Sequence, residues 1–322
     1  MSMSETATRL AEPAASSPRQ ANPKDGESQH GRTHQGKAGA AGHTSVLTLS
    51  CPERPGIVQA VTGFLYERGF DIVEHQQFDD RGRGVFFLRT AFSAESPVDA
   101  SKLEEEFRGT AREFEMEFSF HDETKPRLLV MVSKLGHCLN DLIFRWRAGT
   151  LGGEIAVVVS NHEDLRPMAE AAGLEFVHVP LTADTKAEAE ARLLALIDEH
   201  SIDLVVLARY MQILSDELTT ALKGRAINIH HSFLPGFKGA KPYHQAYERG
   251  VKHVGATAHY VTADLDEGPI IEQEVIRVDH TYHPQTLATV GQDAECLALS
   301  RAVRWHCEHR ILLDGASTVV FR

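Results

Sequence analysis

From Pro126 onward, short apolar runs rich in valine, leucine and isoleucine alternate with longer amphipathic segments. Runs of this length are typical of strands buried on both faces, and the segments between them are long enough for helices. We predict strands at Arg127 to Ser133, Glu154 to Ser160, Phe176 to Val179 and Leu204 to Ala208, and helices at Leu139 to Ala148, Leu165 to Ala172 and Lys186 to His200. This alternation predicts a doubly wound, mostly parallel sheet that binds its ligand beyond the carboxyl ends of the strands.

The preceding segment, from His43 to about Thr124, has a different order of elements. Its pattern is strand, helix, strand, strand, helix, strand, at Ser45 to Cys51, Gly56 to Arg68, Asp71 to Asp79, Val85 to Phe92, Ala100 to Arg112 and Glu115 to Asp122. That order predicts a ferredoxin-like α+β domain. Pro55 and Gly56 open its first helix, where free backbone N–H groups would suit a small anion or an amino acid.

Residues 1–42 contain almost no large apolar side chains and are rich in alanine, serine, glycine and proline. Such a segment buries too little surface to offset its conformational entropy, so we expect a disordered extension. It lacks the apolar core of a secretory signal, and its acidic residues disfavour an organelle transit peptide. The expected division is therefore 1–42, 43–124 and 125–322.

The formal charge of -12 argues against a nucleic-acid surface, and no apolar run approaches the ~20 residues of a membrane helix. The four cysteines, Cys51, Cys138, Cys296 and Cys307, have no metal-like spacing. Free thiols are typical of a reducing compartment, so we expect a cytoplasmic protein without a metal. A nucleophilic role for Cys138 is less favoured than simple burial at a helix start.

The segment Ile227–Ile271 concentrates the chemistry of the chain. Asn228 and His230 alternate with two isoleucines, so a strand would direct both polar side chains to one face. A later strand, Gly255 to Val261, runs into the turn-rich loop 262–269, which carries Asp264, Asp266 and Glu267. An amide, an imidazole and a carboxylate are thus expected to meet at strand ends.

This trio suits attack on a carbonyl group. An amide N–H stabilises a developing oxyanion, an imidazole carries a proton near neutral pH, and a carboxylate orients the imidazole. Water or an amine can then attack directly, without a covalent nucleophile. Asp266 could instead be only a turn former, and among 18 histidines His230 alone would be a weak candidate.

The order of these motifs resembles the formyltransferase fold that uses 10-formyltetrahydrofolate. Asn228-x-His230, Ser-x-Leu-Pro at 232–235 and Leu265-Asp266-x-Gly-Pro carry the resemblance. The stretches 230–235, 238–243 and 249–252 are more narrowly similar to the formyltetrahydrofolate deformylase family. The resemblance implies catalytic roles for Asn228, His230 and Asp266.

In this family the pterin pocket is built largely from backbone, here Arg209 to Leu214 and Thr262 to Asp266. The predicted substrate-binding residues are Arg209, Met211, Gln212, Leu214, His231, Lys241, His259 and Thr262. His231 either lines the pocket or only replaces a proline, and His259 either supports Asp266 or is a satisfied core histidine.

The N-terminal segment resembles an ACT domain through the turn Glu53-Arg54-Pro55-Gly56-Ile57. ACT domains pair edge to edge and bind amino-acid effectors, so the resemblance implies a homo-oligomer and an amino-acid effector. A purely structural dimerisation module has equal weight.

The resulting hypothesis is an enzyme of one-carbon and purine metabolism, a hydrolase that converts 10-formyltetrahydrofolate to tetrahydrofolate and formate. The folate is the substrate, water is its partner, and no separate cofactor is needed. One alternative is a transferase with an amine acceptor, although the loop Ser133 to Cys138 has one glycine where a phosphate-holding relative has a glycine-rich turn. The other is an amino-acid-sensing regulator with an inactive folate-binding domain.

Overall fold

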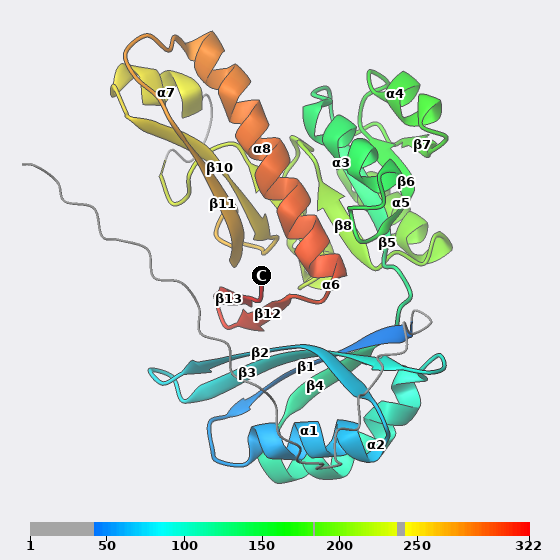
Figure 1. Cartoon of the computed structure of the whole chain (residues 1–322). Coiled ribbons are helices and arrows are strands. Elements are labelled where there is room, and N and C mark those ends of the chain that lie inside the picture. Colours follow the sequence, from blue (N-terminus) through cyan, green and yellow to red (C-terminus); the bar gives the residue numbers. More distant parts are fainter. Residues whose placement is uncertain (1–41, 183, 237–241) are drawn as a thin grey trace, which may run out of the picture. The chain divides into compact units, whose positions relative to one another are not determined.

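Consecutive parts of the chain form two β-sheets, each packed against its own helices (Figure 1). The computed structural model describes residues 42–182, 184–236 and 242–322. Residues 41–322 form one compact unit. The predicted extension, 1–42, lies outside the described residues except for Gly42.

The N-terminal part forms a four-stranded antiparallel sheet with the order β2-β3-β1-β4. Its elements are β1 (His43–Pro52), α1 (Ile57–Glu67), β2 (Asp71–Asp80), β3 (Val85–Ala94), α2 (Ala100–Phe114) and β4 (Glu117–His121). Both helices cover one face, where Phe64, Phe92, Phe107 and Phe120 pack together. The ferredoxin-like prediction is confirmed, with element bounds that differ by a few residues.

The second sheet has seven strands in the order β11-β10-β9-β8-β5-β6-β7. Its strands are β5 (Arg127–Val132), β6 (Glu154–Ser160), β7 (Glu175–His178), β8 (Leu204–Leu207), β9 (Ala226–His230), β10 (His253–Tyr260) and β11 (Ile270–Arg277). β5 to β9 are parallel, and β10 and β11 are antiparallel to their neighbours. The predicted mostly parallel sheet is confirmed as a mixed sheet with two antiparallel strands at one edge.

Helices cover both faces of this sheet, as buried strands require. The helices are α3 (His137–Arg147), α4 (Arg166–Ala171), α5 (Lys186–Glu199), α6 (Asp216–Ala221), α7 (Pro242–Glu248) and α8 (Pro284–Cys307). α3, α4 and α8 share one hydrophobic core with the sheet, and α5 and α6 share the other. The long helix α8 crosses β9, β10 and β11 (Figure 1).

Several elements were not predicted. They are α6, α7, β11 and the C-terminal hairpin of β12 (Ile311–Asp314) and β13 (Ser317–Val320). The helix α8 begins at Pro284, which occupies its first turn, where proline is favoured.

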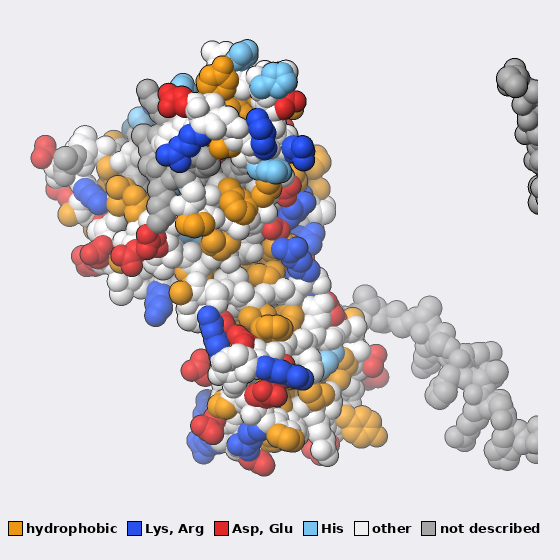
Figure 2. Space-filling model, turned by 90° about the vertical axis from the view of Figure 1, so that its left-hand side faces the viewer, with side chains coloured by type: hydrophobic (Ala, Val, Ile, Leu, Met, Phe, Trp, Pro, Cys, Tyr) orange, Lys and Arg blue, Asp and Glu red, His pale blue; other side chains and the backbone are white. Residues whose placement is uncertain are grey.

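Two further properties concern the distribution of charged and apolar residues. On the face shown in Figure 2, basic and acidic side chains are interspersed. Within the described ranges, no helix combines the length and the apolar character that crossing a membrane requires.

Candidate active site

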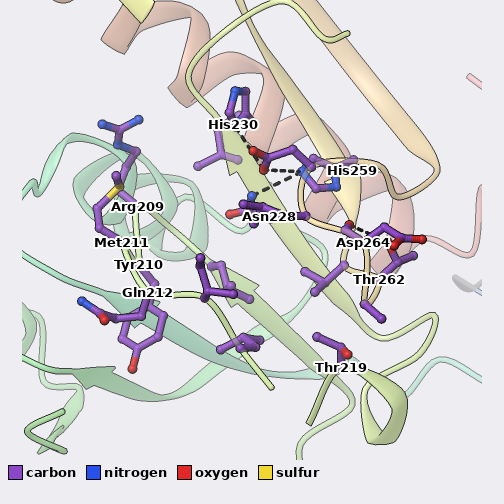
Figure 3. A pocket seen from close by; sticks show the side chains of 18 of the residues that line it. Arg209, Tyr210, Met211, Gln212, Thr219, Asn228, His230, His259, Thr262 and Asp264 are labelled. Atoms are coloured by element: carbon purple, nitrogen blue, oxygen red, sulfur yellow. Dashed lines mark hydrogen bonds and ion pairs between the residues drawn. The ribbon is translucent and has the colours of Figure 1, made fainter. Parts of the chain in front are cut away.

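A pocket of about 410 Å³ opens beyond the ends of β8 and β9 (Figure 3). Three segments form most of its wall: 209–214 after β8, 228–231 at the end of β9, and 261–266 after β10. The pocket therefore lies where a doubly wound sheet is expected to bind its ligand.

The strand β9 directs its polar side chains into this pocket. Ile227 and Ile229 are buried in the core beneath α8, and Asn228 and His230 line the pocket. This is the alternation that the sequence predicted. His230 is only 5 % exposed.

The neighbouring strand β10 fixes the orientation of the amide. His259 lies directly opposite Asn228 in the antiparallel register. Its Nδ1–H donates to the carbonyl of Tyr260 at 2.8 Å, so its Nε2 is free to accept a hydrogen bond from Asn228 Nδ2 at 3.3 Å. Burial lowers the pKa of His259, which favours this neutral form. The second N–H of Asn228 remains for a ligand.

The loop after β10 brings in the carboxylate. Asp266 adopts a left-handed backbone with φ 58°, which aspartate tolerates better than most residues. Gly268 then passes so close to β10 that a Cβ atom there would lie 1.7 Å from the carbonyl oxygen of Tyr260. The glycine is therefore required for the loop to hold Asp266 against the strands.

Asp266 and His230 form the central contact of the site. His230 Nδ1 lies 3.1 Å from Asp266 Oδ1, and His259 Nε2 lies 3.9 Å from the same oxygen. The hydrogen bond from His230 lowers the pKa of Asp266, so the carboxylate is ionised at neutral pH. An ionised acceptor places the proton of a neutral His230 on Nδ1.

The other ring nitrogen of His230 has no such partner. Its Nε2 is buried and makes no hydrogen bond within the described part of the chain. A buried nitrogen with a free lone pair beside an amide donor can take a proton from a nucleophile. This arrangement is that of a general base oriented by a carboxylate.

Ser133, directly after β5, holds the wall formed by residues 209–214 in place. Ser133 donates a hydrogen bond to Asn161 and accepts one from the backbone N–H of Met211 at 3.2 Å. Met211, Ile213 and Leu265 remain exposed at the pocket. Large exposed apolar side chains around a pocket favour a partly apolar ligand.

A second polar cluster lies beyond His231, and we call it the Glu295 cluster. Buried Glu295, from α8, accepts hydrogen bonds from His137 Nε2 at 2.7 Å and from the Tyr243 hydroxyl at 2.9 Å, and Arg209 Nε lies 3.4 Å from it. Burial opposes ionisation of Glu295, but these partners outweigh it and lower its pKa. Glu295, Tyr243 and His137 were not predicted, because they come from three separate helices and form no local pattern.

His231 lies between the Asp266–His230 pair and the Glu295 cluster. Its ring lies 5.1 Å from that of His230 and 6.2 Å from that of Tyr243. Burial and the charge of Arg209 lower the pKa of His231 to about 4. His231 is therefore neutral where Asp266 and Glu295 are charged.

The same region contains groups that could ligate a metal. Ligand atoms of His137, Cys138 and Glu295 lie within 4.8 Å of one another. However, the contact with Cys296 and burial raise the pKa of the Cys138 thiol, and Arg209 already places positive charge beside Glu295. The same raised pKa disfavours Cys138 as a nucleophile.

The remaining predicted residues are distributed as follows. Arg209, Met211, Gln212, Leu214, Thr262 and His231 line the pocket, and so does His259, which contacts Asn228, Tyr260 and Asp266. Thr262 donates its hydroxyl to the carbonyl of Asp264, which is exposed. Lys241 lies outside the described residues.

Comparisons with known proteins agree with this geometry. The family model described as "Formyl transferase" matches residues 126–303. The chain is 57% identical over 279 residues to a formyltetrahydrofolate deformylase of Corynebacterium sp. (strain P-1), covering 86% of this chain and 98% of the relative. The match thus includes the N-terminal sheet.

Solved structures give the same result. A formyltetrahydrofolate deformylase from Burkholderia mallei matches with a TM-score of 0.82 and 53% identity, covering 87% of this chain and 100% of that one. Another, from Pseudomonas syringae pv. tomato, matches with a TM-score of 0.85 and 44% identity, covering 90% and 96%. The chain therefore belongs to the formyltetrahydrofolate deformylase family.

Proposed function

We propose that this protein hydrolyses 10-formyltetrahydrofolate to tetrahydrofolate and formate, with Asn228, His230 and Asp266 as its catalytic residues. The observation that carries the proposal is that His230 Nε2 makes no hydrogen bond with the described residues, whereas its Nδ1 is held by Asp266 and Asn228 lines the same pocket. These are the three groups that water attack on a formamide requires.

In the first step, a water molecule attacks the formyl carbon and gives its proton to His230 Nε2. The carbonyl oxygen becomes an oxyanion, which accepts a hydrogen bond from Asn228 Nδ2 and is attracted by the imidazolium. Asp266 stabilises that imidazolium through the hydrogen bond to Nδ1. His259 prevents the amide from rotating, because it accepts the other N–H of Asn228.

In the second step, the oxyanion collapses and the bond between carbon and N10 breaks. His230 Nε2 returns the proton to N10, so tetrahydrofolate leaves as a neutral amine. The formic acid that remains loses its other proton to solvent and becomes formate. His230 ends in its starting state, as a catalyst must.

The folate is proposed to bind with its pterin in the pocket beside segments 209–214 and 262–266. These segments offer mainly backbone donors and acceptors. Their charged side chains are those of Arg209, Asp264 and Asp266. Backbone groups match the alternating donors and acceptors of a pterin edge. Met211, Ile213 and Leu265 would cover the ring faces.

The direct test is formate release from 10-formyltetrahydrofolate by the purified protein without an amine acceptor. We expect release that is lost in Asp266→Asn, with folding and tetrahydrofolate binding retained. The amide is nearly isosteric but cannot stabilise an imidazolium. Normal turnover in a folded Asp266→Asn protein would refute the assignment.

A formyl transferase with an amine acceptor is the alternative, since the same trio would serve both reactions. The matches to deformylases cover 86% and 87% of this chain and include its N-terminal sheet, which favours hydrolysis. Formyl transfer that begins only when an amine is supplied would establish the transferase instead.

For the N-terminal sheet we propose two roles, pairing with a second copy and binding an amino-acid effector. Strands β2 and β4 form its edges, which leaves backbone groups for another strand. Gly56, with φ 99°, precedes α1 without a side-chain cap, so N–H groups of its first turn are available. Sedimentation with and without amino acids would test both roles.

We further propose that the protein acts in the cytoplasm, in one-carbon metabolism. All four cysteines are free, as expected in a reducing compartment. Localisation of a tagged full-length chain would test this.

A further inference from the structure

Arg209 has a backbone conformation that suits glycine better than arginine. Its φ is 67°, and it is one of five non-glycine residues with positive φ in the described chain. Two of these five, Arg209 and Asp266, line the pocket. Backbone strain of this kind persists at functional sites, where the side chain has a role that another residue cannot fill.

The guanidinium of Arg209 is buried with too few acceptors. The residue is 8 % exposed, and Nε and Nη1 make no hydrogen bond within the described residues. Glu295 is its nearby carboxylate, but the Nε to Oε2 distance is 3.4 Å and His137 binds the same oxygen at 2.7 Å. Buried donors without acceptors are unfavourable, so the guanidinium is suited to donate hydrogen bonds to a further, anionic partner.

The position of Arg209 suggests which anion this is. It lines the pocket together with His230 and His231. Its charge acts on His231, whose ring lies 5.1 Å from that of His230. The proposed reaction changes a neutral formyl group into an anion close to ionised Asp266. Like charges repel, and Arg209 is the guanidinium among the residues that line the pocket.

We propose that Arg209 receives the carboxylate of the product formate and draws it away from Asp266, with Glu295 as an internal competitor for the same guanidinium. This inference rests on the proposed hydrolysis for the identity of the anion. Arginine suits the role because its planar fork matches a carboxylate with two parallel hydrogen bonds. When the site holds no formate, the carboxylate of Glu295 compensates the charge of Arg209. Formate must compete with that carboxylate, which limits the affinity for formate.

The test measures formate binding without turnover. Saturation-transfer NMR with sodium formate gives a dissociation constant for the folded protein in the absence of folate. Arg209→Gln should raise this constant at least tenfold. Glu295→Gln should lower it about threefold or more, because the competing carboxylate is removed but its shape is kept.

Two variants control for other effects. Arg301→Gln removes a partly exposed arginine from the same helix as Glu295 and should leave formate binding unchanged. Arg209→Lys keeps the charge without the fork and should give an intermediate constant. If Arg209→Gln fails to fold, the weakened Arg209→Lys and the tightened Glu295→Gln still test the proposal in opposite directions.

Two results would overturn the inference. In the first, a folded Arg209→Gln protein binds formate as wild type does. In the second, the variant loses tenfold in tetrahydrofolate affinity but not in formate affinity, which would assign Arg209 to the glutamyl carboxylate of the folate. Arg209-dependent formate binding in a protein without hydrolysis would refute the proposed function and leave the formate site standing.

Discussion

Two carboxylates, the partly buried Asp266 and the buried Glu295, lie on either side of His231, and their surroundings differ. Among the described residues, Asp266 has one close partner, His230, whose Nε2 makes no hydrogen bond with any of them. Glu295 has hydrogen bonds from His137 and Tyr243 and a nearby guanidinium. An incompletely satisfied network can exchange protons with a substrate, but a more fully satisfied one mainly stabilises the fold. We therefore expect the two groups to separate activity from stability.

The sharpest test of this difference is His230→Ala. Removal of the general base should lower kcat/KM by up to roughly 10⁴-fold, which corresponds to about 5.5 kcal/mol of transition-state stabilisation. Unfolding in urea should change less than in Glu295→Ala, because the variant loses the hydrogen bond with Asp266 but leaves no buried cation without its partner. A loss of stability without a loss of activity would reverse the roles of the two groups.

Glu295→Ala should have the opposite effect. It leaves Arg209 as an uncompensated buried cation, which destabilises proteins by about 3 to 5 kcal/mol. The midpoint of urea unfolding should fall accordingly, whereas Glu295→Gln should retain part of the stability because its amide can still accept from Tyr243. Equal stability in wild type and Glu295→Ala would show that Arg209 finds another partner.

The sequence predicted one of these groups and not the other, and the reason is physical. Asn228 and His230 share one strand, and Asp266 lies in a turn marked by glycine and proline, so local rules place all three. Glu295, His137 and Tyr243 lie on three helices that only the tertiary packing brings together. No periodicity within a helix indicates which polar side chain will be buried.

The fold shows the same limit. Buried parallel strands were predicted from their continuous apolar runs, but β11 was missed because four of its residues, Glu272, Gln273, Glu274 and Arg277, are polar. Its pairing with β10 is what makes it a strand. The orientation of His259 depends on a different register, that of β10 with β9, so its hydrogen bond with Asn228 could not be derived beforehand.

A smaller effect is expected from Gly291→Ala. A Cβ atom at Gly291 would lie 2.0 Å from the Tyr243 hydroxyl, so Tyr243 must move and weaken its hydrogen bond with Glu295. Overpacking of this kind costs about 1 to 3 kcal/mol. Gly63→Ala is the control, because no atom lies within 4 Å of its Cβ position on α1. That variant should gain up to about 1 kcal/mol. Similar unfolding curves for the two variants would contradict the predicted clash.

The smallest predicted effect comes from His231. Its folded pKa of about 4 lies below the ordinary value of 6.5, so the unfolded chain binds the proton more readily between these pH values. The neutral imidazole stabilises the fold above pH 6.5, and this contribution is lost as the pH falls toward 4. The slope is at most about 1.4 kcal/mol per pH unit for one histidine.

The buried His306 also has a pKa lowered to about 4, so wild type should lose stability faster than one histidine explains. The informative quantity is the difference from His231→Asn, which should show a shallower loss between pH 6 and 5 in urea unfolding. An identical slope in His231→Asn and wild type would mean that His231 is protonated in the folded protein, and that neither burial nor the charge of Arg209 lowers its pKa.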